Sequence, residues 1–362
     1  MNVPKIRFPN FIDNYEKLKY GDVLKIKSGR DQKQVECENG QYPILGTGGE
    51  IGRSNSYLYN KPSVLIGRKG TINKPQYMET PFWTVDTLFY SEIFDTCFPK
   101  YLYYSFQNVN WKKYDESTGV PSLSCSTIEK VDCFIPKKDE QIKVSNFLSL
   151  LDKKIELQSK KIEDLKLFKL SLREKLFYMF PTNNKKLSEI LIKWNKKNKD
   201  SKYSYVESVS NKFGFIAQNE QFEDRNVASN DTSNYYVIEK GVFAYNPSRL
   251  NVGSLALKQN DKVSLVSPLY ECFTTNQNQD FMLEWFQSKE FRRGTFSKYE
   301  GGVRNTLNFN NLSSIEIKLP NLESQNKIVK VLSCYNKMID LELKKLNKLL
   351  EFKKGLMHQL FI

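Results

Sequence analysis

Two loops rich in glycine, serine and basic residues contain the side chains best suited to contact nucleic acid. Residues 67–74 read GRKGTINK, and residues 245–254 read YNPSRLNVGS. Arginine has forked donors that match the acceptor edge of guanine, and asparagine has an amide that matches adenine. The small residues beside them leave backbone N–H groups open to phosphate oxygens. These two loops predict contacts from Arg68, Lys69, Thr71, Asn73, Lys74, Ser248, Arg249, Asn251 and Ser254.

A second pair of segments matches in the same way. Residues 116–124 read ESTGVPSLS and residues 300–308 read EGGVRNTLN, each just before the last strand-like run of its half. Their small residues suit phosphate positioning, and a further basic group follows a helix-like aromatic stretch at 281–296. The alternative is that these segments are only glycine-rich turns on a solvated basic surface. The additional predicted contacts are Ser117, Thr118, Ser122, Arg292, Arg293, Lys298, Arg304 and Asn305.

Catalytic chemistry has little support in the sequence. The only histidine is His358, which excludes histidine-based triads and histidine-rich metal sites, and we expect no metal site at all. Gly46, Gly48 and Gly52 have the wrong spacing for a dinucleotide-binding loop, and no G-x-x-x-x-G-K-[ST] phosphate loop is present. Carboxylates and a lysine arranged as in a nuclease are not evident either. We therefore expect a binding protein without catalytic residues.

The composition favours a nucleic-acid partner. The 362 residues have a formal net charge of +14, with 40% hydrophobic and 13% aromatic residues, so the chain is a folded and strongly basic protein. Such a charge is also compatible with a merely basic surface. No apolar run is long enough to span a bilayer and no leader sequence is evident, so we expect a cytoplasmic protein with no membrane contact. The six cysteines lack C-x-x-C spacing, which predicts reduced thiols.

The elements that position these loops follow from an internal repeat. Residues 136–177 recur at 320–361 with a gap-free shift of 184 positions and 16 identities in 42 residues. In both copies apolar residues recur in steps of three and four over four heptads, as in a coiled-coil seam. The predicted seam residues are Leu148, Leu151, Ile155, Ile162, Leu165, Leu172, Leu332, Tyr335, Ile339, Leu346, Leu349 and Leu356.

Each helix needs a partner for its seam, because leaving a Leu or Ile in water forgoes about 1.5 to 3 kcal/mol of burial free energy. We expect the two long helices to pack antiparallel as a coiled coil around a pseudo-two-fold axis. The predicted fold class is α+β, with similar globular α/β domains at 1–135 and 181–319. The helices at 136–180 and 320–362 separate them.

The whole chain resembles the specificity (S) subunit of type I restriction-modification systems. The resemblance rests on the duplicated helix with its P-x-x-x-E-Q opening at Pro136, Glu140 and Gln141, on VLIGRKGTINK and FWTVDTLFY, and on the N-terminal PKIRFPNF. The second copy departs from this opening at Ser324, where a glutamate would be expected.

This resemblance implies a non-catalytic reader of double-stranded DNA. Each globular half would be a target-recognition domain for one half of a bipartite, asymmetric site. The helices would set the distance between the half-sites and dock two methyltransferase (modification) subunits, which bind S-adenosylmethionine and methylate adenine. Restriction subunits, which are translocases and nucleases using ATP and Mg²⁺, would join that core, and no cofactor is expected on this chain.

Two alternatives remain open at this stage. A coiled-coil scaffold with non-specific DNA affinity would need only the repeat and the positive charge. An autonomous DNA methyltransferase or nuclease would need cofactor and catalytic motifs that the sequence does not contain. Sequence-selective DNA retention by the assembled complex, and DNA modification by the isolated chain, distinguish these possibilities.

Overall fold

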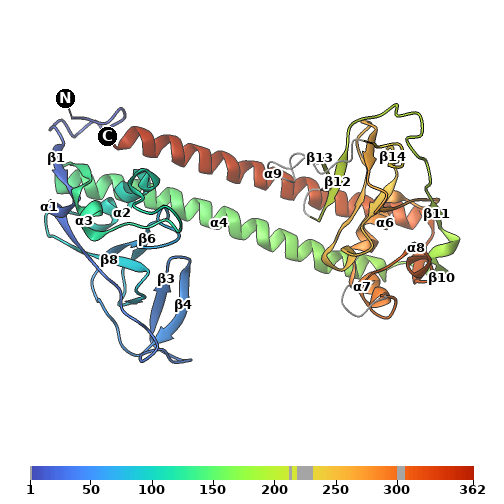
Figure 1. Ribbon diagram of the computed structural model, residues 1–362, viewed down its shortest axis with the longest axis horizontal. Coiled ribbons are helices and arrows are strands. Elements are labelled where there is room, and N and C mark those ends of the chain that lie inside the picture. Colours follow the sequence, from blue (N-terminus) through green and yellow to red (C-terminus); the bar gives the residue numbers. More distant parts are fainter. Residues whose placement is uncertain (1, 212–213, 218–230, 300–305) are drawn as a thin grey trace. The chain divides into compact units, whose positions relative to one another are not determined.

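The computed structural model describes residues 2–211, 214–217, 231–299 and 306–362 (Figure 1). The chain divides into two compact units, residues 1–160 with 343–362, and residues 161–342. Each unit contains one globular domain and parts of the two long helices, α4 (Lys138–Phe177) and α9 (Leu322–Leu360). Helices, sheets and an internal repeat are all present, so the predicted α+β class is confirmed.

A four-stranded antiparallel sheet forms the centre of the first domain. Its order is β2 (Leu24–Lys27), β8 (Leu88–Ile93), β5 (Ser63–Gly67) and β6 (Gln76–Met78). All five residues of β5 are buried, as expected for an inner strand rich in β-branched and aliphatic side chains.

Smaller sheets and short helices complete this domain. The first sheet pairs β1 (Glu16–Lys19) with β9 (Asp132–Ile135), and another joins β4 (Gly49–Ser54), β3 (Tyr42–Gly46) and β7 (Trp83–Thr84). The helical elements are α1 (Tyr20–Val23), α2 (Pro99–Asn108), the 3-10 turn η1 (Trp111–Tyr114) and α3 (Cys125–Lys130).

The second domain repeats this central sheet. Its order is β11 (Leu191–Lys193), β18 (Glu271–Thr275), β15 (Phe243–Tyr245) and β16 (Leu255–Leu257), again antiparallel throughout. The first and last strands of the domain, β10 (Thr182–Lys186) and β19 (Glu316–Pro320), pair as β1 and β9 do. Two domains with one topology confirm the internal repeat beyond the helices.

The remaining elements of the second domain are two antiparallel strand pairs and short helices. They are β12 (Glu207–Ser210) with β13 (Gly214–Ala217), β14 (Tyr236–Ile238) with β17 (Ser264–Val266), η2 (Leu187–Glu189), η3 (Leu250–Val252), α6 (Gln279–Phe286), α7 (Lys289–Phe296) and α8 (Phe309–Ser313).

Within each unit the segments of α4 and α9 pack antiparallel. In the second unit the ring of Phe168 lies 5.4 Å from that of Tyr335, and Lys161 Nζ lies 2.9 Å from Glu342 Oε1. The two contacts lie seven residues apart on each helix, and the residue numbers rise along α4 while they fall along α9. The two segments are therefore antiparallel. All twelve predicted seam residues are buried or half-buried. No helix within the described ranges is long and apolar enough to cross a membrane.

A buried glutamine joins each long helix to its globular domain. Gln141 Oε1 accepts a hydrogen bond from the backbone N–H of Phe98, and its Nε2 donates to the carbonyl of Pro136. Gln325 makes the corresponding contacts with Asn278 and Pro320, at 3.0 and 2.8 Å. Phe98 and Asn278 are the N-cap residues of α2 and α6, so each glutamine ties the start of a domain helix to the start of a long helix.

The departure at Ser324 from the repeated opening has a physical reason. In the first copy Glu140 is almost fully buried and accepts two hydrogen bonds from the Arg7 guanidinium, at 2.8 and 2.7 Å, and one from Tyr15. Arg7 belongs to the N-terminal arm, which precedes β1. A buried carboxylate without such a partner would be costly, and serine at the equivalent place in the second copy avoids that cost.

The six cysteines are free thiols in this structure. Cys97, Cys133 and Cys272 are buried, and burial raises the pKa of the Cys97 thiol to about 11 and that of Cys133 to about 12. These three thiols are therefore protonated core side chains at neutral pH.

Replacing Arg7 should strongly destabilise the first unit. The substitution Arg7→Met leaves Glu140 charged and buried, and breaking a buried pair costs about 3 to 5 kcal/mol. Lys17→Met is the matched control, because both side chains of the Lys17–Asp132 pair are exposed and such a pair contributes little to stability. Denaturant unfolding followed by circular dichroism measures both values. Equal effects of the two substitutions would contradict this assignment.

Candidate nucleic-acid interface

The two loop segments predicted in the first domain lie side by side. Arg68 and Lys69 follow the end of β5, and the carbonyl of Arg68 accepts a hydrogen bond from the N–H of Leu123 at 2.9 Å. Gly70 N–H donates to the carbonyl of Pro121, and Lys69 forms a β-bridge with Ser122. Residues 67–74 and 116–124 therefore form one surface.

Glycine shapes the first of these segments. A Cβ on Gly67 would lie 2.3 Å from the carbonyl oxygen of Thr71, and Gly70 has a φ of +84°. Ile72 is buried beneath the loop and anchors it to the core. The predicted contact residues around this anchor are exposed, apart from the half-buried Thr71; they are Arg68, Lys69, Asn73 and Lys74.

Two carboxylates organise the second segment from within. Asp115 Oδ1 accepts hydrogen bonds from the N–H groups of Ser117 and Ser122, at 3.0 and 2.9 Å, and from the Ser117 hydroxyl. These donors hold the pKa of Asp115 below its ordinary value, with the Ser122 N–H contributing most. Glu116 accepts from the hydroxyls of Thr127 and Ser124, which lowers its pKa as well. Thr118 is exposed, whereas the predicted contacts Ser117 and Ser122 are half-buried.

The loop after β15 in the second domain has a comparable build. Asn246 Oδ1 accepts from the N–H of Ser248, forming a local side-chain turn, and Leu250 is buried as the anchor. Ser248, Arg249 and Asn251 are exposed around it. Ser254, also a predicted contact, is buried and its hydroxyl donates to the carbonyl of Val209 at 3.5 Å.

One of these backbone contacts has a counterpart in the second domain. Leu307 N–H donates to the carbonyl of Pro247 at 3.0 Å, as Leu123 does to Arg68. One residue further on, Ser124 and Asn308 cap α3 and α8 through their side chains. Residues 123 and 307, and residues 124 and 308, differ by the repeat shift of 184, so the two loop pairs are equivalent.

The other predicted contacts in the second domain have different settings. Arg292 and Arg293 are exposed on α7, and Lys298 is half-buried just after it, with its carbonyl accepting from the Asn311 side chain. Arg304 and Asn305 lie outside the described residues.

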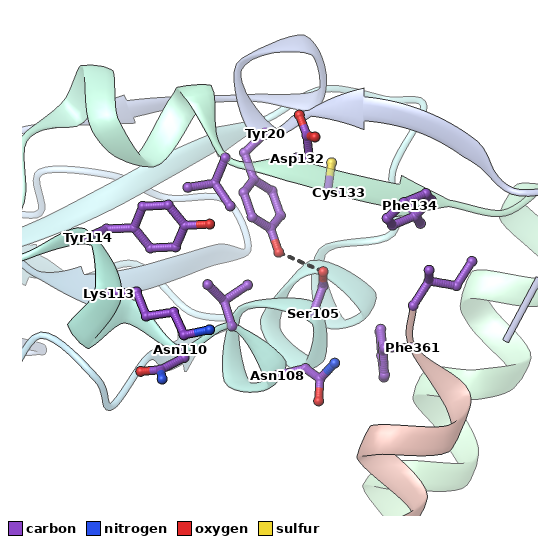
Figure 2. Close-up of a pocket in the computed structure, with 13 residues that line it drawn as sticks. Tyr20, Ser105, Asn108, Asn110, Lys113, Tyr114, Asp132, Cys133, Phe134 and Phe361 are labelled. Atoms are coloured by element: carbon purple, nitrogen blue, oxygen red, sulfur yellow. Dashed lines mark hydrogen bonds between the residues drawn. The ribbon is translucent and has the colours of Figure 1, made fainter. Parts of the chain in front are cut away.

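A cavity in the first unit is separate from these loops. Figure 2 shows its lining, which includes Tyr20 with its hydroxyl 2.7 Å from that of Ser105, together with Asn108, Cys133 and Phe361. It encloses about 310 Å³ near the ends of α2 and α9 and contains none of the predicted contact residues. In the part of the chain that the structure describes, no three His, Cys, Asp or Glu side chains are grouped to hold a metal ion.

A family model matches each half of the chain. The model of the type I restriction modification DNA specificity domain covers residues 12–167 and again residues 181–351. Each match contains one globular domain, its loop pair and part of the following long helix.

The chain belongs to this type I DNA specificity family. The solved S subunit of a type I restriction-modification system from M. genitalium is similar over 99% of each chain, with a TM-score of 0.60 and 16% identity. A chain solved in work on complex assembly and conformational transition of the type I R-M system is similar over 96% of this chain and 97% of that one, with a TM-score of 0.56 and 10% identity. No curated protein matches the sequence.

Sequence reasoning missed the residues that build the loops of this specificity subunit from inside. Asp115 and Glu116 are not among the predicted functional residues, although an aspartate before small residues is a recognised turn signal. The contacts that Gln141 and Gln325 make with the domain helices, called here the glutamine clamp, could have been suspected from the sequence, because both glutamines belong to the repeated opening.

Removing the Asp115 carboxylate should loosen residues 115–124. Asp115→Ala deletes the acceptor for three donors, so amide hydrogen exchange at Ser117 and Ser122 should accelerate, whereas Asp115→Asn retains Oδ1 and part of the protection. Because the folded pKa is lowered, native protection should be complete above the unfolded pKa and lost as pH falls through the folded pKa. Glu79→Ala, which breaks an ion pair with Lys100, is the control. Unchanged exchange in Asp115→Ala would refute this role.

Proposed function

We propose that the chain selects DNA sites for a type I restriction-modification complex by reading two half-sites, one with each target-recognition domain. The domains are residues 1–135 and 181–319. The observation that carries the proposal is the repetition of one loop pair, with exposed basic and amide side chains in both domains. The domains differ in sequence at these loops, so the two half-sites differ and the full site is asymmetric.

The side chains of the loops divide into two roles. Arg68, Asn73, Arg249 and Asn251 are exposed and can donate in forked geometry to guanine or adenine edges, where one good bidentate contact contributes about 1 to 3 kcal/mol of discrimination. Lys69, Lys74 and the arginines of α7 act on phosphates without regard to sequence, so overall affinity should fall steeply with salt. The two long helices act as the spacer between the half-sites.

The chemistry is assigned to partner subunits. Two methyltransferase subunits would supply S-adenosylmethionine and transfer its methyl group to adenine, and restriction subunits would supply ATP-dependent cleavage. Family membership supports this division, together with the lack of cofactor and phosphate-loop motifs in the sequence. The complex would work in the cytoplasm, where it meets double-stranded DNA.

A second apolar stripe on the long helices suits the methyltransferase subunits. It runs beside the buried seam and is exposed; its members include Phe147, Leu150 and Leu157 on α4, and Val331, Met338 and Leu341 on α9. Phe147 matches Val331 and Leu157 matches Leu341 under the shift of 184. An exposed stripe that occurs twice fits two copies of one partner.

Arg249→Ala should relax one half-site and leave the other intact. We expect single-molecule sequencing of methylated adenines, after reconstitution with the cognate methyltransferase, to show tolerance at one position of one half-site. Arg292→Ala is the control, because loss of a phosphate contact should weaken binding to all sequences and lower the salt dependence. Equal loss of selectivity in both half-sites would contradict the assignment of Arg249 to base reading.

Leu157→Asp and Leu341→Asp should each reduce binding of one methyltransferase subunit by at least about tenfold, because a charge replaces a leucine that binding would bury. Leu170→Asp is the matched control. Leu170 is 46% exposed, faces another side of α4 and corresponds to Lys354 rather than to an apolar residue. Analytical ultracentrifugation of reconstituted complexes gives the stoichiometry. An equal loss with Leu170→Asp would exclude the stripe as the docking surface.

A further inference from the structure

The two target-recognition domains rest on their long helices through equivalent but differently charged sites. The glutamine clamp fixes the equivalence, because Gln141 binds the N-cap residue Phe98 and Gln325 binds the N-cap residue Asn278. The sixth residue after each N-cap is therefore equivalent. It is Tyr104 on α2 and Glu284 on α6.

In the first unit the carboxylate that contacts both the lysine and the tyrosine of this site comes from the long helix. Tyr104 Oη donates to Asp152 Oδ2 of α4 at 2.8 Å. Lys353 of α9 places its Nζ 2.6 Å from Asp152 Oδ1 and 5.5 Å from the centre of the Tyr104 ring. The recognition domain thus contributes a neutral hydroxyl to a lysine–aspartate pair that the helices already possess.

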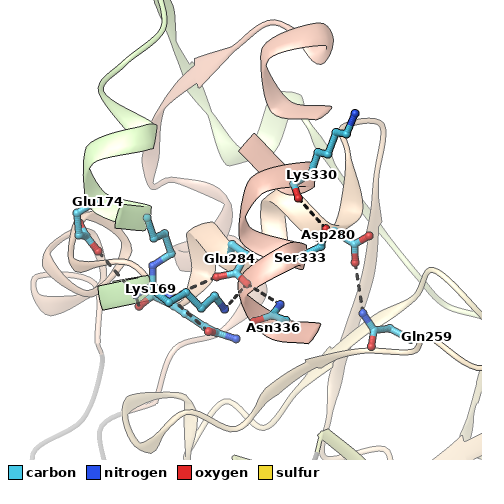
Figure 3. Close-up of polar contacts among 10 residues, drawn as sticks. Lys169, Glu174, Gln259, Asp280, Glu284, Lys330, Ser333 and Asn336 are labelled. Carbon is cyan, nitrogen blue, oxygen red and sulfur yellow. Dashed lines mark hydrogen bonds and ion pairs between the residues drawn. The ribbon is translucent and has the colours of Figure 1, made fainter. Parts of the chain in front are cut away.

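In the second unit the carboxylate that pairs with the equivalent lysine comes from the recognition domain instead (Figure 3). Glu284 is 8% exposed, and its Oε1 lies 2.6 Å from Lys169 Nζ of α4 and 3.4 Å from Asn336 Nδ2 of α9. Arg173 of α4, which is also buried, approaches the other oxygen at 3.5 Å. Glu174 of α4 lies 3.7 Å from Arg173, so without Glu284 the site would lose the carboxylate that pairs with Lys169 and one of the two beside Arg173.

The repeat relates these residues one to one. Under the shift of 184, Lys169 corresponds to Lys353 and Asn336 to Asp152. The lysine is the same in both sites, whereas the carboxylate has moved from the long helix in one unit to the globular domain in the other. In the first unit only Asp152 of the pair Tyr104 and Asp152 is acidic. In the second unit only Glu284 of the pair Glu284 and Asn336 is acidic.

We propose that these two positions form a matched pair, in which only one member is acidic, and that this pair determines which recognition domain can be seated on which long helix. A domain with glutamate at this position, seated on α4, would place that glutamate beside Asp152. Two carboxylates would then share Lys353. A domain with tyrosine, seated on α9, would leave Lys169 without its carboxylate partner in a largely buried site and would remove one of the two carboxylates beside Arg173. DNA specificity can then be changed by exchanging recognition domains only if the following helix keeps the matching residue.

This inference rests on contacts within each unit, so its test measures folding and does not depend on the proposed DNA site. In the full-length chain, Tyr104→Glu and the neutral control Tyr104→Gln are each combined with native Asp152 or with Asp152→Asn. Both Tyr104 substitutions lose the same packing, and the difference between them isolates the charge. Thermal unfolding of the first unit is the readout.

With native Asp152, Tyr104→Glu should melt roughly 4 °C or more below Tyr104→Gln. With Asp152→Asn the order should reverse or the gap should close, because the new carboxylate can then pair with Lys353. A gap that is the same in both backgrounds would overturn the proposal.

The second unit provides an independent cycle should the Tyr104 variants fail to fold. Glu284→Tyr should lower the unfolding midpoint, and adding Asn336→Asp should recover at least half of the loss by supplying the carboxylate from α9. Asn336→Ala on the Glu284→Tyr background is the control, since it changes the same position without adding a charge. Equal midpoints for the Asn336→Asp and Asn336→Ala combinations would overturn the matched pair in this unit.

Discussion

The architecture depends on a buried amide that ties each long helix to the domain before it. Gln141 and Gln325 are almost completely buried, and each uses both ends of its side chain, accepting from the first N–H of a domain helix and donating to a backbone carbonyl at the helix start. Neither N–H could reach an intrahelical acceptor, so the amide satisfies a donor that burial would otherwise leave unpaired. The domain helix and the long helix therefore start from a common point in each unit.

This fixed attachment has consequences for the loops that read DNA. The central sheet of each domain packs against the domain helix whose start the glutamine binds, α2 in the first domain and α6 in the second. The first loop of each pair follows an inner strand of that sheet, β5 or β15. Short backbone contacts, Leu123 to Arg68 and Leu307 to Pro247, then hold the two loops of each pair together. A rigid scaffold beneath variable surface residues allows the recognised bases to differ between the domains while the backbone remains alike.

The repeat is broken at two ion pairs, one buried and one partly exposed. Glu140 pairs with Arg7, and the residue equivalent to Glu140 in the second copy is Ser324. Asp152 pairs with Lys353, and the residue equivalent to Asp152 is Asn336, which lies next to Glu284. At each place the carboxylate is present only where a cation faces it, or is supplied from another element, because an uncompensated buried charge would cost more than the pair contributes. Apolar positions such as Leu148 and Leu332 are under no such constraint and stay identical.

The sequence by itself determined the duplicated helix, its seam and the existence of two similar domains, because heptad spacing and a constant shift of 184 are visible along one dimension. It also indicated which loops correspond, and it placed Arg68 and Arg249 where the structure has exposed side chains. Tertiary structure alone decided which side chains are available and which are paired. Ser254 is turned inward at the start of β16, and Arg7 meets Glu140 across 133 residues of chain. Such partners come together through the fold, and no local pattern records a contact between residues that far apart.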